Sequence, residues 1–167
     1  MKNIEVSIIK KEFINPFIEA AATVLPQIVS GISFTRLGLE LAKENHASPE
    51  KLAVIILGVI GAIRGRVIYI LDNKLASQIS MNMLKETCVS DELTPLARSA
   101  LSEMTNMITG KAISILSNAG YNADFSPPTL FIGKEIMIPE SDVQAILIPF
   151  QTQFGNLELN IALKEKS

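Results

Sequence analysis

Apolar residues recur at helical spacing in the first thirty residues of the chain. Asn15 and Pro16 form a pair that commonly starts a helix, a capping side chain followed by a proline at the first helical position. From Phe17 to Ile28, apolar side chains follow every three or four residues, which predicts a helix with one buried face. Pro26 lies within this pattern and is expected to kink the helix or end it early.

A longer helix is predicted in the second half of the chain. Thr94 and Pro95 repeat the pairing of a capping residue with a proline, and apolar residues recur at helical spacing from there to about Asn118. Gly120 is the expected stop, because glycine readily adopts the left-handed conformation that ends many helices. A shorter helix is expected after Asp72, whose carboxylate suits a helix N-terminus.

Strands are predicted where apolar residues alternate with polar ones or run continuously between turn residues. The expected segments are 32–34, 37–41, two strands within 52–71 joined by a glycine-containing turn, 130–132, 136–138 as a continuation or a hairpin arm, 143–150 and 157–163. The last two are expected to form a hairpin around Gly155. In the final segment every second residue is leucine or isoleucine, so its other face is expected to meet water.

The order of these elements predicts an α+β fold. Each half of the chain opens with a proline-initiated helix and continues into hairpin-like strands. We therefore expect a single domain of two pseudo-repeated helix-plus-hairpin halves, with an extended β-sheet and long helices packed on it. Residues 1–12 are expected to be an N-terminal arm or an edge strand.

The composition is unusually apolar, with 48% hydrophobic and 19% charged residues in a chain of 167, where ordinary domains carry roughly 25% charged residues. Either a membrane segment or apolar surface hidden in a large core or an interface would explain this. The longest uncharged apolar stretch runs from Leu52 to Ile63, well short of the roughly 20 residues that a membrane-spanning helix needs. No secretory signal pattern is evident near Met1. The sequence therefore favours a cytoplasmic protein with hidden apolar surface and no membrane association.

Charge and cysteine content exclude further classes. The net charge of −2 provides no basic footprint for nucleic acid. The single cysteine, Cys88, cannot form an internal disulfide, which is consistent with a reducing compartment. His46 has no second histidine or cysteine near it in sequence. Neither residue is predicted to bind a metal or to act as a nucleophile.

The long predicted helix carries a polar stripe. Ser99, Glu103 and Asn106 stand at positions i, i+4 and i+7 and therefore line up, whereas Met104 and Met107 belong to the broad apolar side. A carboxylate there can accept a charge-assisted hydrogen bond from a partner's lysine or arginine, and a carboxamide can orient a water molecule. From the spacing alone, a face that is simply solvated is the more common outcome.

Four features, in this order, resemble the CheX proteins, which are chemotaxis phosphatases of the wider CheC/CheX/FliY group. They are the opening-helix segment 13–21, the Ser99-x-x-x-Glu103-x-x-Asn106 signature, Pro127 and Pro128 at the distance where the signature's proline is expected, and the closing hairpin 148–161. The resemblance covers roughly Phe13 to Lys164, so a CheX-like domain is expected over residues 13–167.

The resemblance implies a phosphatase that hydrolyses the aspartyl phosphate of a CheY-type response-regulator receiver domain. On that pattern Glu103 docks on the receiver's lysine, Asn106 orients the attacking water, and Ser99, Pro127 and Pro128 contribute to binding. The chain itself is expected to bind no cofactor, because the Mg²⁺ belongs to the receiver.

The same resemblance implies one site per chain and a homodimer formed by paired sheet edges. The first helix has Glu19 but carries Ala22 where a second site would need asparagine. Two alternatives from other classes remain: a non-catalytic signalling module that binds a receiver or a flagellar-switch partner, and a dimeric sensor of a small ligand. Nothing in the sequence supplies the convergent polar groups that the sensor would need.

Overall fold

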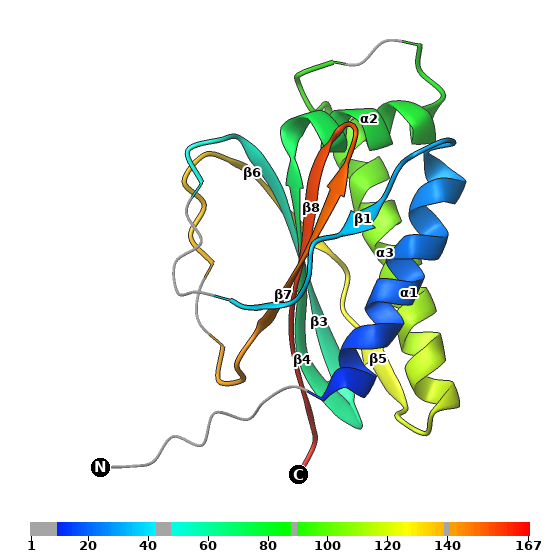
Figure 1. The fold of residues 1–167 in the computed structure, drawn as a ribbon, viewed down its shortest axis with the longest axis vertical. Helices are drawn as coiled ribbons and strands as arrows, with labels where there is room; N and C mark the ends of the chain where they lie inside the picture. The colour runs from blue at the N-terminus through cyan, green and yellow to red at the C-terminus, as the bar shows by residue number, and fades with distance from the viewer. Residues whose placement is uncertain (1–9, 43–47, 88–89, 139–140) are drawn as a thin grey trace.

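The computed structural model describes residues 10–42, 48–87, 90–138 and 141–167. Residues 1–9 of the predicted arm, His46 and Cys88 lie outside these ranges. Within them, the helices pack on one side of a single antiparallel sheet (Figure 1). The helices are α1 (Lys11–Ile28), α2 (Asn73–Leu84) and α3 (Pro95–Asn118). The strands are β1 (Thr35–Arg36), β2 (Glu40–Leu41), β3 (Leu52–Gly61), β4 (Ile63–Asp72), β5 (Ala123–Phe125), β6 (Thr129–Gly133), β7 (Ile146–Thr152) and β8 (Gly155–Glu165).

The strand order shows how the two halves of the chain interlock. The sheet runs β1-β7-β8-β4-β3-β5, with β2 also paired to β7 and β6 also paired to β3. Each half therefore contributes a long hairpin, β3–β4 or β7–β8, and the two short strands that precede it pair with the hairpin of the other half. The central β4–β8 pair joins the halves. The predicted α+β class and its helix-plus-hairpin halves are confirmed.

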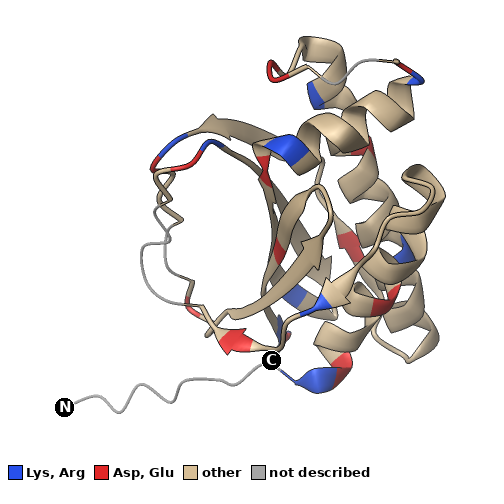
Figure 2. Ribbon diagram, turned by 45° about the horizontal axis from the view of Figure 1, so that its top comes forward, with Lys and Arg blue, Asp and Glu red and all other residues tan. Residues whose placement is uncertain are grey.

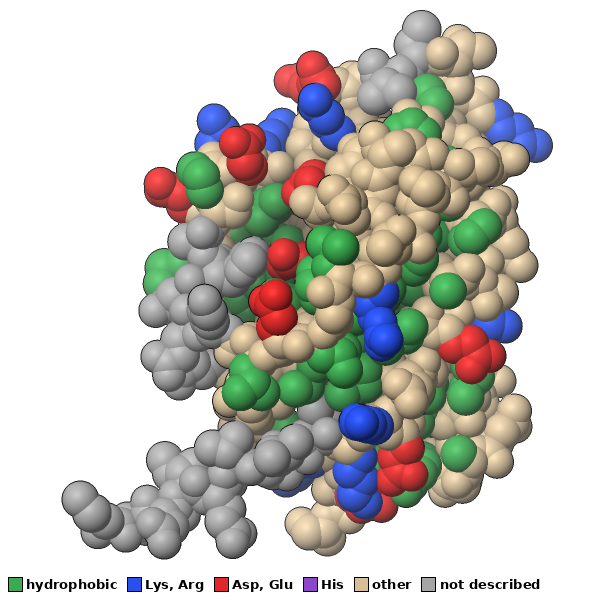
Figure 3. All heavy atoms as spheres, viewed as in Figure 1, with side chains coloured by type: hydrophobic (Ala, Val, Ile, Leu, Met, Phe, Trp, Pro, Cys, Tyr) green, Lys and Arg blue, Asp and Glu red, His purple; other side chains and the backbone are tan. Residues whose placement is uncertain are grey.

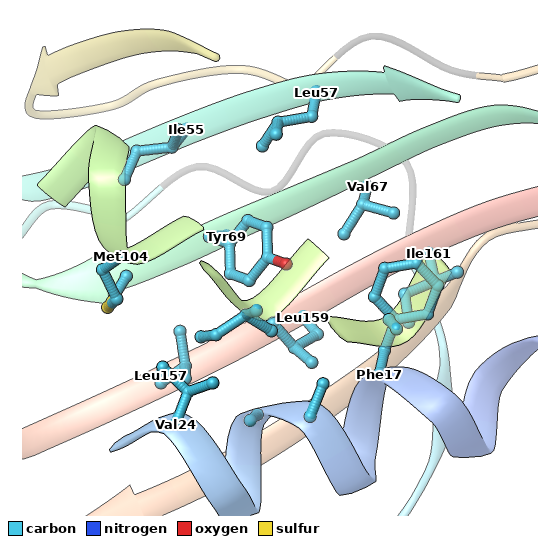
Figure 4. Packing of buried hydrophobic residues seen from close by; sticks show 14 of the residues in the cluster. Phe17, Val24, Ile55, Leu57, Val67, Tyr69, Met104, Leu157, Leu159 and Ile161 are labelled. Atoms are coloured by element: carbon cyan, nitrogen blue, oxygen red, sulfur yellow. The ribbon is translucent and has the colours of Figure 1, made fainter. Parts of the chain in front are cut away.

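The main core lies between the sheet and the helices. Alternate residues of the long strands point toward α1 and α3 and are fully buried (Figure 4). On the two central strands these residues are Ile63, Val67, Tyr69, Leu71, Leu157, Leu159, Ile161 and Leu163.

The opposite face of the sheet is covered over its centre, so the expectation of a wet face on the last strand is wrong there, whereas Glu158 and Lys164 on that face are half-buried. Asn160 is 4% exposed and Ala162 is fully buried. Ala162 packs with Val143 and Ala145, and Ile138 covers apolar residues of β3 and β4. In Figure 2 the described parts of the β6–β7 connection pass on the side of the sheet away from the helices. Burial on both faces accounts for the low proportion of charged residues.

The first helix starts earlier than predicted. It begins at Lys11, so the last two residues of the predicted arm belong to it and Pro16 lies inside the helix rather than at its start. The extra turn places Phe13 and Ile14 in the core, where both are buried. Pro26 lacks the amide hydrogen that would bond to Ala22, and the helix ends shortly afterwards.

The long helix has the predicted boundaries. The Thr94 hydroxyl accepts a hydrogen bond from the Ala97 amide at 3.1 Å. At the other end the amide of Gly120 donates to the Ser117 carbonyl, and the next amide donates to Leu116. Gly120 has a φ of +97°, so this is the expected glycine stop.

Asp72 precedes α2 as predicted but does not cap it. Its side chain makes no capping hydrogen bond. Its carboxylate instead accepts a hydrogen bond at 2.8 Å from the amide of Asn156, in the β7–β8 hairpin. The side chain therefore fastens that hairpin to the start of α2.

The short strands differ from the prediction. Residues 32–34 and 136–138 are not strands. In the segment before β3, Thr35–Arg36 and Glu40–Leu41 are the strand residues that pair with β7. Arg36 pairs with Phe150 and Glu40 with Leu147, so one extra residue bulges out of this edge. In contrast, the two buried strands predicted within 52–71 and the closing hairpin around Gly155 are confirmed.

Gly58 lies within β3 and Gly65 within β4, and Gly61 lies at the β3–β4 turn. Gly65 has a φ of +145°, and a Cβ placed there would overlap the carbonyl oxygen of Ala162 in β8. A side chain at this position is excluded by both backbone conformation and space.

We expect Gly65→Ala to lower the free energy of unfolding by about 3 kcal/mol or more, or to prevent folding. Gly38→Ala is the matched control, because Gly38 also has a positive φ, of +124°, but a Cβ placed there would have nothing within 4 Å; it should cost about 1 kcal/mol. Urea unfolding followed by circular dichroism measures both. Equal losses for the two variants would show that the close approach to β8 is unimportant.

Candidate functional site

The predicted polar stripe lies on the outer side of α3. Ser99 and Glu103 are exposed, and Asn106 is half-buried. The Ser99 hydroxyl donates to the Pro95 carbonyl one turn earlier at 3.2 Å. The opposite side of the helix is held in the core by Met104 and other fully buried apolar side chains. This packing sets the rotation of the helix and turns the stripe outward.

A buried hydrogen bond fixes α3 to the sheet near Asn106. Thr109 is fully buried, and its hydroxyl lies 2.7 Å from the Tyr69 hydroxyl of β4. Burial raises the pKa of Tyr69 above its ordinary value, so the phenol stays protonated near neutral pH. Thr105 is also buried and donates to the Ser102 carbonyl. The helix that carries Asn106 is thus fixed to the sheet by polar as well as apolar contacts.

The connection from β5 to β6 runs beside the same part of α3. A Cβ placed on Gly110 would lie 3.8 Å from the ring of Phe125, which ends β5. The next residue, Ser126, is fixed to Gly58 of β3 by two hydrogen bonds, one of them between the serine hydroxyl and the Gly58 amide at 2.8 Å. Gly110 follows Asn106 by one helical turn, so this connection starts next to the flank of α3 that bears Asn106.

Pro127 and Pro128 follow directly in this connection. Pro127 is exposed and Pro128 is half-buried. Their proline rings stiffen the segment, because each fixes its own backbone φ. The structure therefore places the proline pair in the connection that begins beside Gly110 of α3.

Glu103 and Asn106 are free to meet a partner. In the described part of the chain, neither side chain makes a hydrogen bond or an ion pair. The site is thus an unpaired carboxylate and an unpaired carboxamide, one turn apart on the outer surface of a firmly packed helix. Such a surface suits a protein partner, which can bring a cation to the one group and a reacting atom to the other.

Comparison with known proteins decides the family. The family model described as "Chemotaxis phosphatase CheX" matches residues 53–151, more than half of the chain. This chain belongs to the CheX family. The matched region contains the whole of α3 and both prolines.

Two relatives are similar to this chain along most of its length, and one complex shares its fold. The "CheY-P phosphatase CheX" of Thermotoga maritima is 29% identical over 123 residues, which are 74% of this chain and 77% of the relative. The crystal structure of chemotaxis protein CheX from Vibrio vulnificus has a TM-score of 0.81 at 29% identity and covers 92% of this chain and 99% of that chain. The CheX-CheY-BeF3-Mg²⁺ complex from Borrelia burgdorferi matches with a TM-score of 0.74 at 24% identity, over 92% and 98% of the two chains, and supports the fold.

Within this CheX-family chain, the structure shows one complete stripe. On α1, Glu19 and Ala22 are both exposed, in positions like those of Glu103 and Asn106 on α3. Alanine can neither accept nor donate a hydrogen bond through its side chain. Since α1 has alanine three residues after Glu19, the glutamate and asparagine at these matching positions occur together on α3.

Two general features of the described residues bear on the site. They contain no group of three or more histidine, cysteine, aspartate or glutamate side chains that could hold a metal ion. Among the helices that the structure describes, none is long and apolar enough to cross a bilayer.

We expect Tyr69→Phe to lower the free energy of unfolding of this CheX-family protein by about 1 kcal/mol, because the variant leaves the buried Thr109 hydroxyl without its partner. The helix carbonyl of Thr105 can take over part of that hydrogen bonding, which limits the loss. Tyr121→Phe is the matched control, since the Tyr121 hydroxyl bonds to Glu12 at the exposed surface. Urea unfolding measures both. An equal or smaller loss for Tyr69→Phe would contradict a stabilising role of the buried bond.

Proposed function

We propose that this protein accelerates hydrolysis of the aspartyl phosphate on a CheY-type receiver domain. The family is described as a chemotaxis phosphatase, and the Thermotoga maritima relative is a CheY-P phosphatase. The observation that carries the proposal is the unpaired Glu103 and Asn106 on the outer face of α3, in the region matched by the family model.

Glu103 docks the receiver. Its carboxylate is exposed and accepts a charge-assisted hydrogen bond from the receiver's lysine beside the phosphorylated aspartate. Because Glu103 stands on a helix packed into the core, its backbone position is fixed before the receiver arrives. Ser99, Pro127 and Pro128 border this contact and add to binding.

Asn106 orients the water that attacks phosphorus. Its carboxamide offers both a donor and an acceptor, so one water molecule can be held in line with the bond to be broken. The water oxygen bonds to phosphorus, and the bond from phosphorus to the aspartyl oxygen breaks. The aspartate is left as a carboxylate, and both protons of the water leave on the inorganic phosphate, as dihydrogen phosphate. An acyl phosphate is a reactive group, so positioning alone gives a useful gain: about a hundredfold corresponds to about 2.7 kcal/mol of barrier. No titratable base is required.

The metal ion in this scheme belongs to the partner. Mg²⁺ neutralises phosphoryl oxygens during transfer, and the Borrelia burgdorferi complex contains Mg²⁺ together with CheX and CheY. We place Mg²⁺ on the receiver and no cofactor on this chain. A receiver substrate of this kind also places the protein in the cytoplasm.

We expect Asn106→Ala to reduce the receiver's dephosphorylation rate about a hundredfold, toward the rate of the receiver alone, while binding to a beryllofluoride-activated receiver is retained. Glu103→Ala should weaken that binding, because the docking carboxylate is lost. Phosphate loss from a phosphorylated receiver with Mg²⁺ measures the first effect, and titration calorimetry measures the second. Asn118→Ala is the matched control, since Asn118 is an exposed asparagine at the far end of α3.

Two results would contradict this scheme. Full activity of Asn106→Ala would show that the carboxamide does not orient the water. A wild-type protein that binds the phosphorylated receiver without speeding its decay would instead be the non-catalytic signalling module, with a receiver or a flagellar-switch protein as its partner.

A homodimer formed by pairing of sheet edges is a further part of the proposal. The edge made by β1 and β2 is short and bulged, and Leu37, Leu39 and Leu41 along it are exposed. In Figure 3 apolar side chains gather on the face of the molecule that contains this edge. An exposed strand edge with apolar residues is a common site of association.

We expect sedimentation equilibrium to give a mass twice the 18.2 kDa of the chain, because association covers the exposed leucines of the β1–β2 edge. Leu39→Asp should shift the protein toward the monomer, and Met137→Asp, at an exposed methionine elsewhere, should not. A stable monomer at tens of micromolar would contradict the dimer.

A further inference from the structure

Two large apolar side chains of α3 lie on the solvent side of the helix. Leu96 is 61% exposed and Met107 is 37% exposed, whereas Met104 and Ile108 are fully buried. The sequence pattern assigned Met107 to the buried side, and that assignment is wrong. At about 100° per residue, Met107 lies about 40° from Glu103 around the helix and about 60° from Met104. The rotation that buries Met104 and Ile108 therefore leaves Met107 near the edge of the exposed face.

Both side chains extend the polar stripe. Met107 follows Glu103 by one turn and Leu96 precedes it by two turns, so all three share a face of the helix. The helix rises about 16 Å from Leu96 to Met107, at about 1.5 Å per residue. A standard protein interface of about 800 Å² per partner is roughly 30 Å across. One partner can thus cover the whole stripe.

The remaining positions on this face allow a partner to approach closely. Ser99 and Gly110 lie along the same line and have short side chains or none. Asn106 is half-buried and its side chain is short. Its carboxamide can therefore reach a phosphoryl group on a partner only when the helix itself lies against that partner. Contact at Asn106 then brings Met107 and the neighbouring turn into contact as well.

We propose that Leu96 and Met107 are the apolar docking contacts of this site and pack against apolar residues that border the phosphorylated aspartate of the receiver. This inference rests on the proposed function and assigns a separate role to each side chain of the site. The two apolar side chains supply binding energy, Glu103 fixes the register of the complex, and Asn106 acts on the water. A flexible methionine suits this place, because its side chain adapts to the surface that it meets.

The arrangement also gives the face two distinct flanks. Asn106 stands on the flank next to the β5–β6 connection, and Met107 stands on the other side of Glu103. The receiver's phosphorylation site must then lie over the flank with Asn106. The apolar residues that border it must lie over the flank with Met107. Substitution at Met107 should accordingly weaken docking without disturbing the water at Asn106.

The test compares Met107→Glu and Leu96→Glu with the wild-type protein in steady-state hydrolysis of a phosphorylated receiver with Mg²⁺. We expect KM to rise at least tenfold in each variant while kcat stays within about twofold. The dissociation constant for the beryllofluoride-activated receiver should rise in parallel. Met137→Glu is the matched control, because Met137 is 64% exposed outside this face, and its KM and kcat should not change. Met107→Ala, with no new charge, should raise KM about threefold, and circular dichroism confirms that each variant is folded.

The outcomes separate this inference from the function on which it rests. If both glutamate variants have the same KM as the wild-type protein, Leu96 and Met107 are not docking contacts. A fall in kcat at constant KM would lead to the same conclusion. If the wild-type protein shows no phosphatase activity, the proposed function fails. The dissociation constants for the activated receiver then decide the docking role, which stands if the glutamate variants bind at least tenfold more weakly and fails if they bind equally well.

Discussion

The packing of α3 against the sheet and the neighbouring helices is the contact on which the site depends. Apolar side chains such as Met104 and Ile108 are fully buried beneath the helix, and the hydrogen bond between Tyr69 and Thr109 joins it to β4. A helix with one buried stripe has a narrow range of rotations that keep the whole stripe away from water. That rotation turns Glu103 outward and leaves Asn106 at the border with the β5–β6 connection. The placement of the chemical groups is therefore a consequence of how the core packs.

The interlocked halves explain why the chain has two similar helix faces. Each half contributes a helix, two short strands and a hairpin, and the short strands of each half pair with the hairpin of the other. The fold thus places α1 and α3 in comparable positions against one sheet. Glu19 and Ala22 on α1 and Glu103 and Asn106 on α3 differ in the carboxamide. The architecture provides two similar helix faces, and α1 has alanine at the position where α3 has Asn106.

Covering the sheet on both sides gives the protein its unusual composition. The face toward the helices forms the main core, and the other face is covered by residues such as Val143 and Ile138 from the β6–β7 connection. Charged residues are scattered over the helices, strands and connections (Figure 2). A sheet with two buried faces needs apolar residues at nearly every strand position, whereas a sheet with one wet face needs them at every second position.

The sequence by itself determined the features that neighbouring residues control. Thr94 and Pro95 start α3 and Gly120 ends it, because capping and left-handed backbone depend on a few adjacent residues. The sequence also predicted the two long hairpins and the stripe from Ser99 to Asn106, and it contained the family resemblance. Only the tertiary structure decided that α1 extends back to Lys11, that Asn160 is covered, and that Thr109 is buried while Met107 is exposed. Each of these features depends on residues from a distant part of the chain that pack against it. A local pattern of apolar and polar positions does not specify those residues.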